Sequence, residues 1–251
     1  MCVYSLSLCP NIPTGQARPP ERTGGGPLNF VVVSIMPCSA KKEEILRPES
    51  KTEGVQDVDY VVDTVELANM IELRGVEVSA LEEDYADAPY SLETGSGVIF
   101  GASGGVMESA LRYLTQNAAD ARQVLEDNAA RGKRGVRELN LEIAGRTVRA
   151  AITSGLASAR ALLERVKSGE VQYDVIEVMA CPGGCIMGGG QPPYDYYFAQ
   201  DSLYEKLKGG VLRTDEEAEV TESSRNPQAY RLFEGMSREA RHKLLHRNIQ
   251  R

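Results

Sequence analysis

The sequence EVMACPGGCIMGGGQPP, residues 177–193, begins inside the run YDVIEVMA at 173–180, which is rich in apolar and β-branched residues. A short run of this kind predicts a buried β-strand. Cys181 and Cys185 follow that strand directly, at the position where open α/β sheets place their binding sites. Five glycines, at 183, 184 and 188–190, let the backbone approach a bulky ligand closely, and we expect Gly184 to line it.

A third cysteine follows another predicted strand. NFVVVSIM, residues 29–36, has the pattern of a buried parallel strand, and Cys38 comes two residues later. Pro37 restricts the backbone beside this thiol, and the lysines at 41 and 42 favour its thiolate form. Thiolates are soft ligands that select iron–sulfur clusters, zinc or copper. Cysteine pairs also occur as plain buried thiols in tight turns, so spacing alone leaves both interpretations open.

The rest of the chain predicts an α/β protein with parallel and mixed sheets flanked by helices. Residues 96–116 predict a strand at 98–100, a glycine turn and a helix with its apolar face on Val106, Ala110, Leu111 and Leu114. The other predicted elements are an extended segment at 58–63, a helix at 64–75 ending at Gly75, a hairpin at 135–155, a helix at 156–169 capped by Ser154 and ended by Gly169, tail helices at 201–210, 226–235 and 237–247, and a solvated acidic connector at 214–224.

Composition narrows the function classes. The chain has 251 residues, a net charge of −8 and a sequence pI near 5.0, which argues against nucleic acid as a partner. No apolar run approaches the ~20 residues of a membrane-spanning helix, so we expect no membrane partner. The first residues lack the features of a signal peptide, and the five cysteines are odd in number, so we expect a reducing, cytoplasmic location.

Taken together, the two cysteine segments resemble a known family. MPC-x-x-K-x-x-E with a following RPE, and E-x-M-A-C-x-x-G-C-x-x-G-G-G-Q-P, are similar to the second and third signature motifs of iron-only (FeFe) hydrogenases. GVIFGASGGVMESALR resembles the segment between those motifs, and NPQAYRLFEGMSREARHKLLH resembles a small-subunit-type tail. The resemblance predicts a catalytic domain at 30–193 and a helical tail at 194–251. Residues 1–29 do not match the family, and the Gly-, Pro- and Arg-rich composition of 14–27 predicts a flexible segment there.

The resemblance implies an H-cluster, which is a 4Fe-4S cubane joined to a diiron subcluster with CO, cyanide and a bridging dithiolate. Cys38 and Cys181 then correspond to cubane ligands, and Cys185 to the cysteine that bridges cubane and diiron unit. Lys41 matches a lysine that donates to a cyanide, and Glu44 matches a glutamate of the proton path. The residues expected to pack around the diiron unit are Met36, Pro37, Phe100, Gly101 and Met179.

Each of these residues also has a purely structural interpretation. Met36, Met179 and Phe100 are of the types that fill ordinary cores, and residues 41–44 form a charge run of the kind that is usually solvated. His242 and His246 are four apart on a predicted helix and can share a face, but no third metal ligand is evident.

The family's first signature motif, two adjacent cysteines followed by proline, has no clear counterpart. Cys9 precedes Pro10 but lies only 29 residues before Cys38, and the intervening family sequence is absent. We therefore expect an incomplete catalytic domain, which leaves three explanations: a partner chain completes it, it is a fragment, or the start of the sequence is misassigned.

The implied reaction is reversible 2H⁺ + 2e⁻ ⇌ H₂, with electrons from ferredoxin or a redox partner protein and insertion of the cluster by hydrogenase maturation proteins. The alternatives are a non-catalytic iron–sulfur protein of the nuclear prelamin A recognition type, which serves cytosolic cluster assembly, and a cluster-free interaction module.

Overall fold

The computed structural model describes residues 32–52, 55–82, 84, 92–127, 135–143, 145–192 and 200–245. The chain divides into two compact units, and each is described by itself. Among the described residues, the large unit comprises 92–127, 135–143, 145–188 and 200–230, and the small unit comprises 32–52, 55–82, 84, 189–192 and 231–245. None of the described helices is both long enough and apolar enough to cross a membrane.

The large unit is built on a sheet of three strands in the order β5 (Val136–Ile143), β6 (Arg146–Ser154) and β7 (Val175–Met179). β5 and β6 form the predicted antiparallel hairpin, and β7 pairs with β6 in parallel. A parallel pair needs a crossover, and α7 (Leu156–Lys167) provides it. The predictions of the hairpin, the helix and a strand before Cys181 are therefore confirmed, but that strand is not fully buried, since Val175 and Val178 are each 41% exposed.

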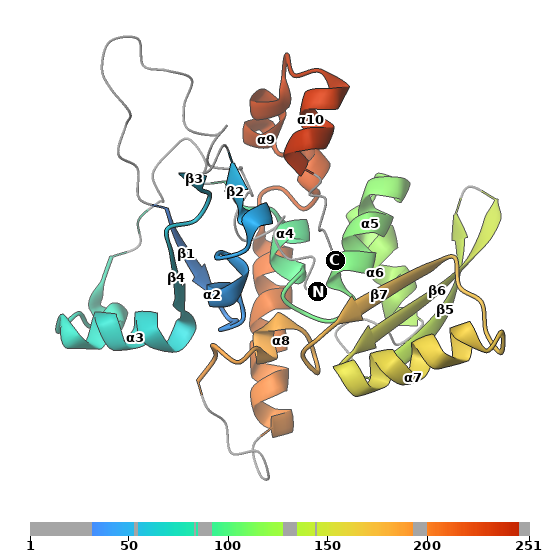
Figure 1. Cartoon of the computed structure of the whole chain (residues 1–251), viewed down its shortest axis with the longest axis horizontal. Helices are drawn as coiled ribbons and strands as arrows, with labels where there is room; N and C mark the ends of the chain where they lie inside the picture. Colours follow the sequence, from blue (N-terminus) through green and yellow to red (C-terminus); the bar gives the residue numbers. More distant parts are fainter. Residues whose placement is uncertain are drawn as a thin grey trace. The chain divides into compact units, whose positions relative to one another are not determined.

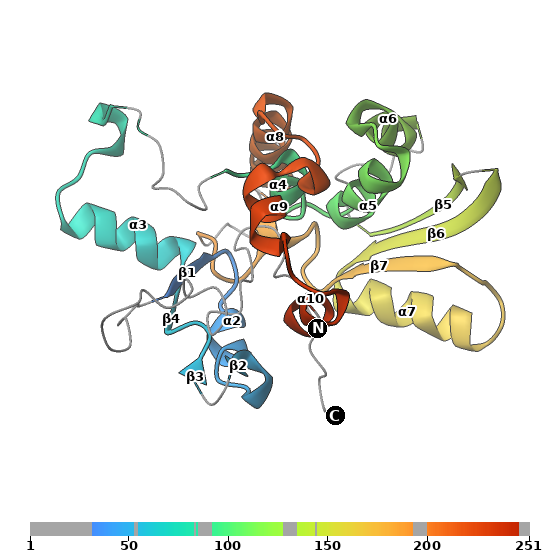
Figure 2. The same ribbon diagram turned by 90° about the horizontal axis from the view of Figure 1, so that it is seen from above.

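Helices cover both faces of this sheet. α7 lies along one face, and α5 (Gly105–Thr115) and α6 (Ala118–Asp127) lie on the other (Figures 1 and 2). The alternation along the strands sends one set of apolar side chains toward α5 and α6. That core is made of Met107, Leu111, Ala121, Leu125, Leu139, Leu141, Ala150 and Ile152, all buried.

Ser154 does not cap α7, so that prediction is wrong. The N-cap position belongs to Gly155, which has no side chain to offer. The Ser154 hydroxyl instead accepts hydrogen bonds from the backbone N–H groups of Gly135 and Gly183. The side chain thus connects the end of the sheet to the turn that holds the cysteines.

The segment before α5 also differs from its prediction. The sequence predicts a strand at 98–100, but α4 (Gly95–Ile99) is a short helix. The Thr94 hydroxyl accepts from the N–H of Gly97 and starts this helix. The expected apolar face of α5 is only partly right, since Ala110 and Leu114 are exposed. Met107 and Leu111 are buried there beside the charged side chains of Glu108 and Arg112.

The tail is helical, as predicted, with α8 (Gln200–Glu217), α9 (Pro227–Phe233) and α10 (Arg238–Leu245). The acidic connector predicted at 214–224 is wrong at its start, because α8 continues to Glu217. Asp215 is fully buried and pairs with Arg112, so tertiary ion pairing overrides the polar composition of this segment. The short helix η4 (Ser223–Arg225) follows.

In the small unit, β1 (Val33–Met36) runs parallel to β4 (Tyr60–Asp63), and α3 (Thr64–Leu73) follows β4. The smaller elements are α2 (Lys41–Glu44), η1 (Pro48–Ser50), β2 (Lys51–Thr52), β3 (Val55–Gln56) and η2 (Val78–Ala80). The prediction of a parallel strand before Cys38 is confirmed, but that strand is not fully buried. Val33 is 48% exposed and Ile35 is 52% exposed, because β1 buries only its other face, with Ser34 at 5%.

Candidate functional site

The cysteine turn of the large unit, residues 181–188, begins where β7 ends. Gly184 N–H donates to the carbonyl of Cys181 over 3.1 Å, and the single 3₁₀ turn η3 (Cys185–Met187) follows. Gly183 and Gly184 have φ of 90° and 102°, values that residues with a side chain rarely adopt. The glycines therefore allow the chain to reverse and place two thiols on one short turn. Cys185 is 9% exposed, and Cys181 is half-buried.

A second glycine turn, residues 101–104, supports the cysteine turn. Ser103 N–H donates to the carbonyl of Gly183, and Ile186 N–H donates to the carbonyl of Gly101, each over 3.0 Å. A Cβ added to Gly184 would lie 2.6 Å from the carbonyl oxygen of Gly101. Gly184 is thus required for contact between two stretches of this chain's own backbone. Its predicted contact with a ligand remains a prediction.

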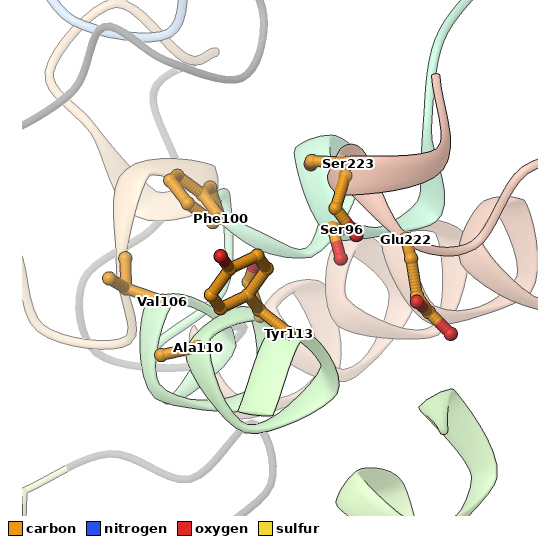
Figure 3. Close-up of a pocket in the computed structure, with 9 residues that line it drawn as sticks. Ser96, Phe100, Val106, Ala110, Tyr113, Glu222 and Ser223 are labelled. Atoms are coloured by element: carbon orange, nitrogen blue, oxygen red, sulfur yellow. The ribbon is translucent and has the colours of Figure 1, made fainter. Parts of the chain in front are cut away.

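Phe100 lines a pocket of about 330 Å³ between α4, α5 and η4. In Figure 3 its ring lies on the same side of the pocket as Val106, with Tyr113 close by. The lining residues are Ser96, Phe100, Val106, Ser109, Ala110, Tyr113, Glu222, Ser223 and Ser224. Gly101, the next residue, is not among them and packs against Ile186. Met179, at the end of β7, is 1% exposed.

Glu177, the first residue of the cysteine motif, is a buried carboxylate that the sequence pattern did not mark as a site residue. It lies on β7 and is 7% exposed. Its carboxylate accepts from the N–H groups of Gly104 over 2.6 Å and Met107 over 2.7 Å, at the start of α5. Burial raises the pKa of Glu177, while these N–H bonds and Arg137 favour its charged form. The sequence does contain one indication of its importance, since Glu177 is the only charged residue of the otherwise apolar strand β7.

In the small unit, Met36 ends β1, and Pro37 and Cys38 lead toward α2. Cys38 is 9% exposed, and its carbonyl accepts from Lys41 N–H over 3.3 Å. Gly190, from the end of the glycine run at 188–190, donates its N–H to the carbonyl of Pro37 over 3.1 Å. A Cβ added to Gly190 would lie 2.9 Å from the Cys38 nitrogen. The last glycine of the run therefore packs directly on the Cys38 loop.

The predicted charge run at 41–44 is not simply solvated. Lys41 is 6% exposed, and its Nζ donates to Glu44 over 2.6 Å. Lys42 contacts Asp63 and Glu66 over 3.1 and 2.6 Å. The Glu66 N–H and the Lys42 ammonium lower the pKa of Asp63, and Lys42 and the Asp63 N–H lower the pKa of Glu66. Hydrogen bonds to these two carboxylates raise the pKa of Lys42.

The predicted site residues thus fall into two sets, one in each unit. The large unit holds Phe100, Gly101, Met179, Cys181, Gly184 and Cys185, and the small unit holds Met36, Pro37, Cys38, Lys41 and Glu44. The three described cysteines are thiols rather than disulfides. Among the described residues, no three His, Cys, Asp or Glu side chains form a group that would hold a single metal ion. Cys9 and His246 lie outside the described residues.

Comparison with known proteins matches most of the chain to one family. Residues 19–189 match the model of the family described as "Iron only hydrogenase large subunit, C-terminal domain". The periplasmic Fe hydrogenase large subunit of Nitratidesulfovibrio vulgaris is 41% identical over 173 residues, which cover 68% of this chain and 41% of that protein. Cytosolic iron-sulfur assembly component 3 of Mus musculus is 33% identical over 165 residues, which cover 63% of this chain and 35% of that protein.

The fold has solved counterparts as well. The FeFe-hydrogenase HydA1 of Chlamydomonas reinhardtii, in a glutamate-to-glutamine variant, superposes with a TM-score of 0.69 at 27% identity, covering 96% of this chain and 69% of that one. This chain spans about two fifths of the length of the curated relatives that it matches. Because the family model matches more than half of its residues, the chain belongs to the family of C-terminal domains from the large subunits of iron-only hydrogenases.

Proposed function

We propose that this chain binds a 4Fe-4S cluster through Cys38, Cys181 and Cys185, and that it serves reversible proton reduction to H₂ at an H-cluster. The observation that carries this proposal is the cysteine turn, in which two positive-φ glycines lie between two cysteines four residues apart, just after strand β7. The match of residues 19–189 to the hydrogenase family supports it.

The donor set fits an iron–sulfur cluster chemically. Cysteine thiolates are the usual ligands of such clusters, and all three described cysteines are thiols. Each cysteine of a 4Fe-4S cluster binds a different iron, so the thiols need not converge on one ion as in a zinc site. The low exposure of Cys38 and Cys185 would keep water away from a bound cluster.

The bound H-cluster, with its diiron subcluster carrying CO, cyanide and a bridging dithiolate, would supply the redox chemistry. We propose that Cys185 links this diiron unit to the cubane. Met36 and Met179 would then form a soft apolar wall, as would Pro37, Phe100 and Gly101. The ammonium of Lys41 would donate to an anionic ligand, since charge-assisted hydrogen bonds are strong in a dry pocket. Glu44, already in contact with Lys41 Nζ, would pass protons.

The proposal includes partners. Electrons would come from ferredoxin or a redox partner protein, and hydrogenase maturation proteins would install the diiron unit. Residues 194–251 would form a small-subunit-like tail on the catalytic part at 30–193.

The test is anaerobic reconstitution with iron and sulfide, loading with a synthetic diiron precursor, and assay of H₂ evolution from reduced viologen. Infrared bands of CO and cyanide would report the diiron unit, and iron and sulfide analysis would report the cubane. Cys185→Ala should lose the infrared bands and the H₂ evolution, whereas Cys2→Ala controls for the removal of a cysteine as such.

A second function is favoured by one observation, the 33% identity to cytosolic iron-sulfur assembly component 3. In that case the chain is a non-catalytic iron–sulfur protein of cytosolic cluster assembly. A bound cubane without diiron bands or H₂ evolution would support this second function and contradict the first. A folded chain that binds no iron would contradict both and leave an interaction module.

A further inference from the structure

Two charged side chains lie in one row across the sheet of the large unit. Arg137 on β5 and Glu177 on β7 are both paired in register with Ile152 on the central strand β6. The row faces the α5 side of the sheet, where Ile152 belongs to the apolar core. Arg137 is 9% exposed and Glu177 is 7% exposed. Burying a charge is costly unless it makes specific contacts, so the contacts of this pair indicate its role.

The pair holds two consecutive residues of the glycine turn at 101–104. Arg137 Nη2 donates to the hydroxyl of Ser103 over 2.7 Å, and Glu177 accepts from the N–H of Gly104 over 2.6 Å. Ser103 in turn donates its N–H to the carbonyl of Gly183. A continuous chain of hydrogen bonds therefore runs from Arg137 through Ser103 to the peptide between Cys181 and Cys185.

Arg137 also retains unused donors. Its Nε and Nη1 are buried and have no hydrogen-bond partner within the described part of the chain. Both Glu177 oxygens are already engaged by backbone N–H groups. Tyr204, which interacts with Arg137 electrostatically, packs in one apolar cluster with Ile186 and Met187 of the cysteine turn. Arg137 is therefore a desolvated guanidinium with unpaired N–H donors, and Ser103 connects it to the cysteine turn. Such a group favours negative charge nearby.

We propose that Arg137 is a positioning residue of the cysteine turn, which it holds through Ser103, and that its positive charge stabilises the anionic cluster bound by Cys181 and Cys185. The second part rests on the proposed function, because it requires a bound cluster. Net charge and hydrogen bonding near a cluster set its reduction potential. A nearby cation stabilises the reduced state, which carries one more negative charge, and so raises the midpoint potential.

The charge is tested on the reconstituted full chain by a redox titration of the 4Fe-4S cluster, followed by electron paramagnetic resonance. Arg137→Gln should lower the midpoint potential by about 59 mV or more, which is a tenfold change in the one-electron equilibrium. Arg137→Lys keeps the charge and should restore most of the potential. Arg146→Gln, on an exposed arginine of the same hairpin, is the matched control and should change nothing. An Arg137→Gln midpoint equal to that of the wild type overturns the role of the charge.

The positioning role is tested without any cluster. In the apo chain, Arg137→Gln should raise the alkylation rate of Cys185 about fivefold, the factor expected for the loss of one hydrogen bond that holds the turn. Ser103→Ala removes the same hydrogen bond from the other side and should raise the rate equally. Unchanged rates in both variants overturn the positioning role. A wild-type chain that loads no cluster would refute the proposed function, while the apo measurement would still decide the positioning role.

If Arg137→Gln does not fold, two other variants decide. Ser103→Ala then tests the positioning alone. Glu177→Gln, assayed at pH 8 where the wild-type carboxyl is more fully ionised, removes the opposing negative charge and should raise the midpoint potential. A lowered or unchanged potential in Glu177→Gln overturns the electrostatic part.

Discussion

Cys38 and Cys185 are equally buried, at 9% exposure each, but different forces hold the loops that carry them. The turn of Cys185 is fixed by backbone hydrogen bonds to the turn at 101–104 and by an apolar cluster with Tyr204. The loop of Cys38 accepts one backbone hydrogen bond from Gly190 and leads into α2, whose lysines pair with carboxylates that are between 13% and 48% exposed. Equal burial of two thiols therefore does not mean equal protection.

The difference concerns how each loop responds to solution conditions. Packing and backbone hydrogen bonds are nearly insensitive to salt, whereas partly exposed ion pairs are screened at physiological ionic strength and contribute little free energy each. Substitutions in each unit test this contrast.

Arg112→Met should destabilise the chain most strongly, because it removes a buried charge from the large unit, whose cysteine turn is held mainly by packing. Arg112 is fully buried and contacts Asp215 through two hydrogen bonds of 2.6 and 2.7 Å, and Glu108 through a third. Its removal takes away the guanidinium that faces two buried carboxylates. The free energy of unfolding should fall by about 3–5 kcal/mol, measured by denaturant titration with circular dichroism.

Arg122→Met is the matched control for Arg112→Met. Arg122 also contacts Asp215, over 3.2 Å, but its side chain is 26% exposed. Its removal should cost about 1 kcal/mol or less. Equal losses in the two variants would show that burial does not decide the strength of these ion pairs.

Gly184→Ala should damage the packed cysteine turn directly. Gly184 combines a φ of 102° with a Cβ position only 2.6 Å from a backbone oxygen, so both strain and overlap oppose any side chain. The expected loss is about 2–4 kcal/mol of unfolding free energy, with faster alkylation of Cys185. Gly209→Ala, in α8 with open space around it, should instead stabilise the chain by about 0.5–1 kcal/mol. A Gly184→Ala chain as stable as the wild type would contradict the described geometry.

Gly190→Ala should have a smaller effect, confined to the Cys38 loop. The added Cβ would lie 2.7 Å from Asp63 Cβ and 2.9 Å from the Cys38 nitrogen. We expect a loss of about 1–3 kcal/mol and faster alkylation of Cys38, with the Cys185 rate unchanged. Gly189→Ala is the neighbouring control, since its Cβ would meet only the Ser39 hydroxyl, at 3.2 Å, and that side chain can rotate away. If both cysteines reacted faster in Gly190→Ala, the two loops would not be independent.

Much of this arrangement follows from local sequence patterns. The first strand of the hairpin alternates with period two, and the helix after the hairpin ends at Lys167, two residues before Gly169, where φ is 79°. The strand preceding Cys181 is short and rich in apolar, β-branched residues, so the sequence locates it. The cysteine turn follows this strand, and its position is therefore located as well. The glycines at 183 and 184 also mark a turn in the sequence, but the sequence predicts their approach to a ligand, whereas the structure shows Gly184 against the backbone of Gly101.

Features that depend on partners distant in sequence were not predictable in the same way. Asp215 lies in an acidic segment, and its burial depends on the ion pair with Arg112, which is 103 residues earlier in the sequence. Residues 98–100 are apolar and include β-branched side chains, which favour a strand. A helix forms there instead, because the Thr94 hydroxyl accepts the N–H of Gly97 and caps it. Arg137 resembles any polar residue of an alternating strand, and only the pairing of β6 with both β5 and β7 aligns it with Glu177.

Lowering the pH should have the smallest effect on the two units, and the effects should be opposite. The carboxylates of the small unit lose stabilising interactions in acid, whereas Glu177 of the large unit gains stability when it binds a proton. The pKa values of Asp63 and Glu66 are lowered below their ordinary 3.8 and 4.5, so their contribution to the stability of the small unit is complete above pH 4.5. It is lost as the pH falls through the lowered values. Burial raises the pKa of Glu177, so the folded large unit binds its proton earlier than the unfolded chain and gains stability as the pH falls toward 4.5.

Thiol reactivity can follow both units in a single sample. We would measure the reaction of Cys38 and Cys185 with a disulfide reagent from pH 6 to pH 3, each as a ratio to the rate in urea at the same pH. Cys38 should lose protection at the acid end, and Asp63→Asn should already be less protected at pH 6, with a flatter pH profile. Cys185 should keep its protection over the same interval. Parallel loss at both cysteines would mean that the two loops open together, and the contrast between a packed and an ionic loop would then have no functional meaning.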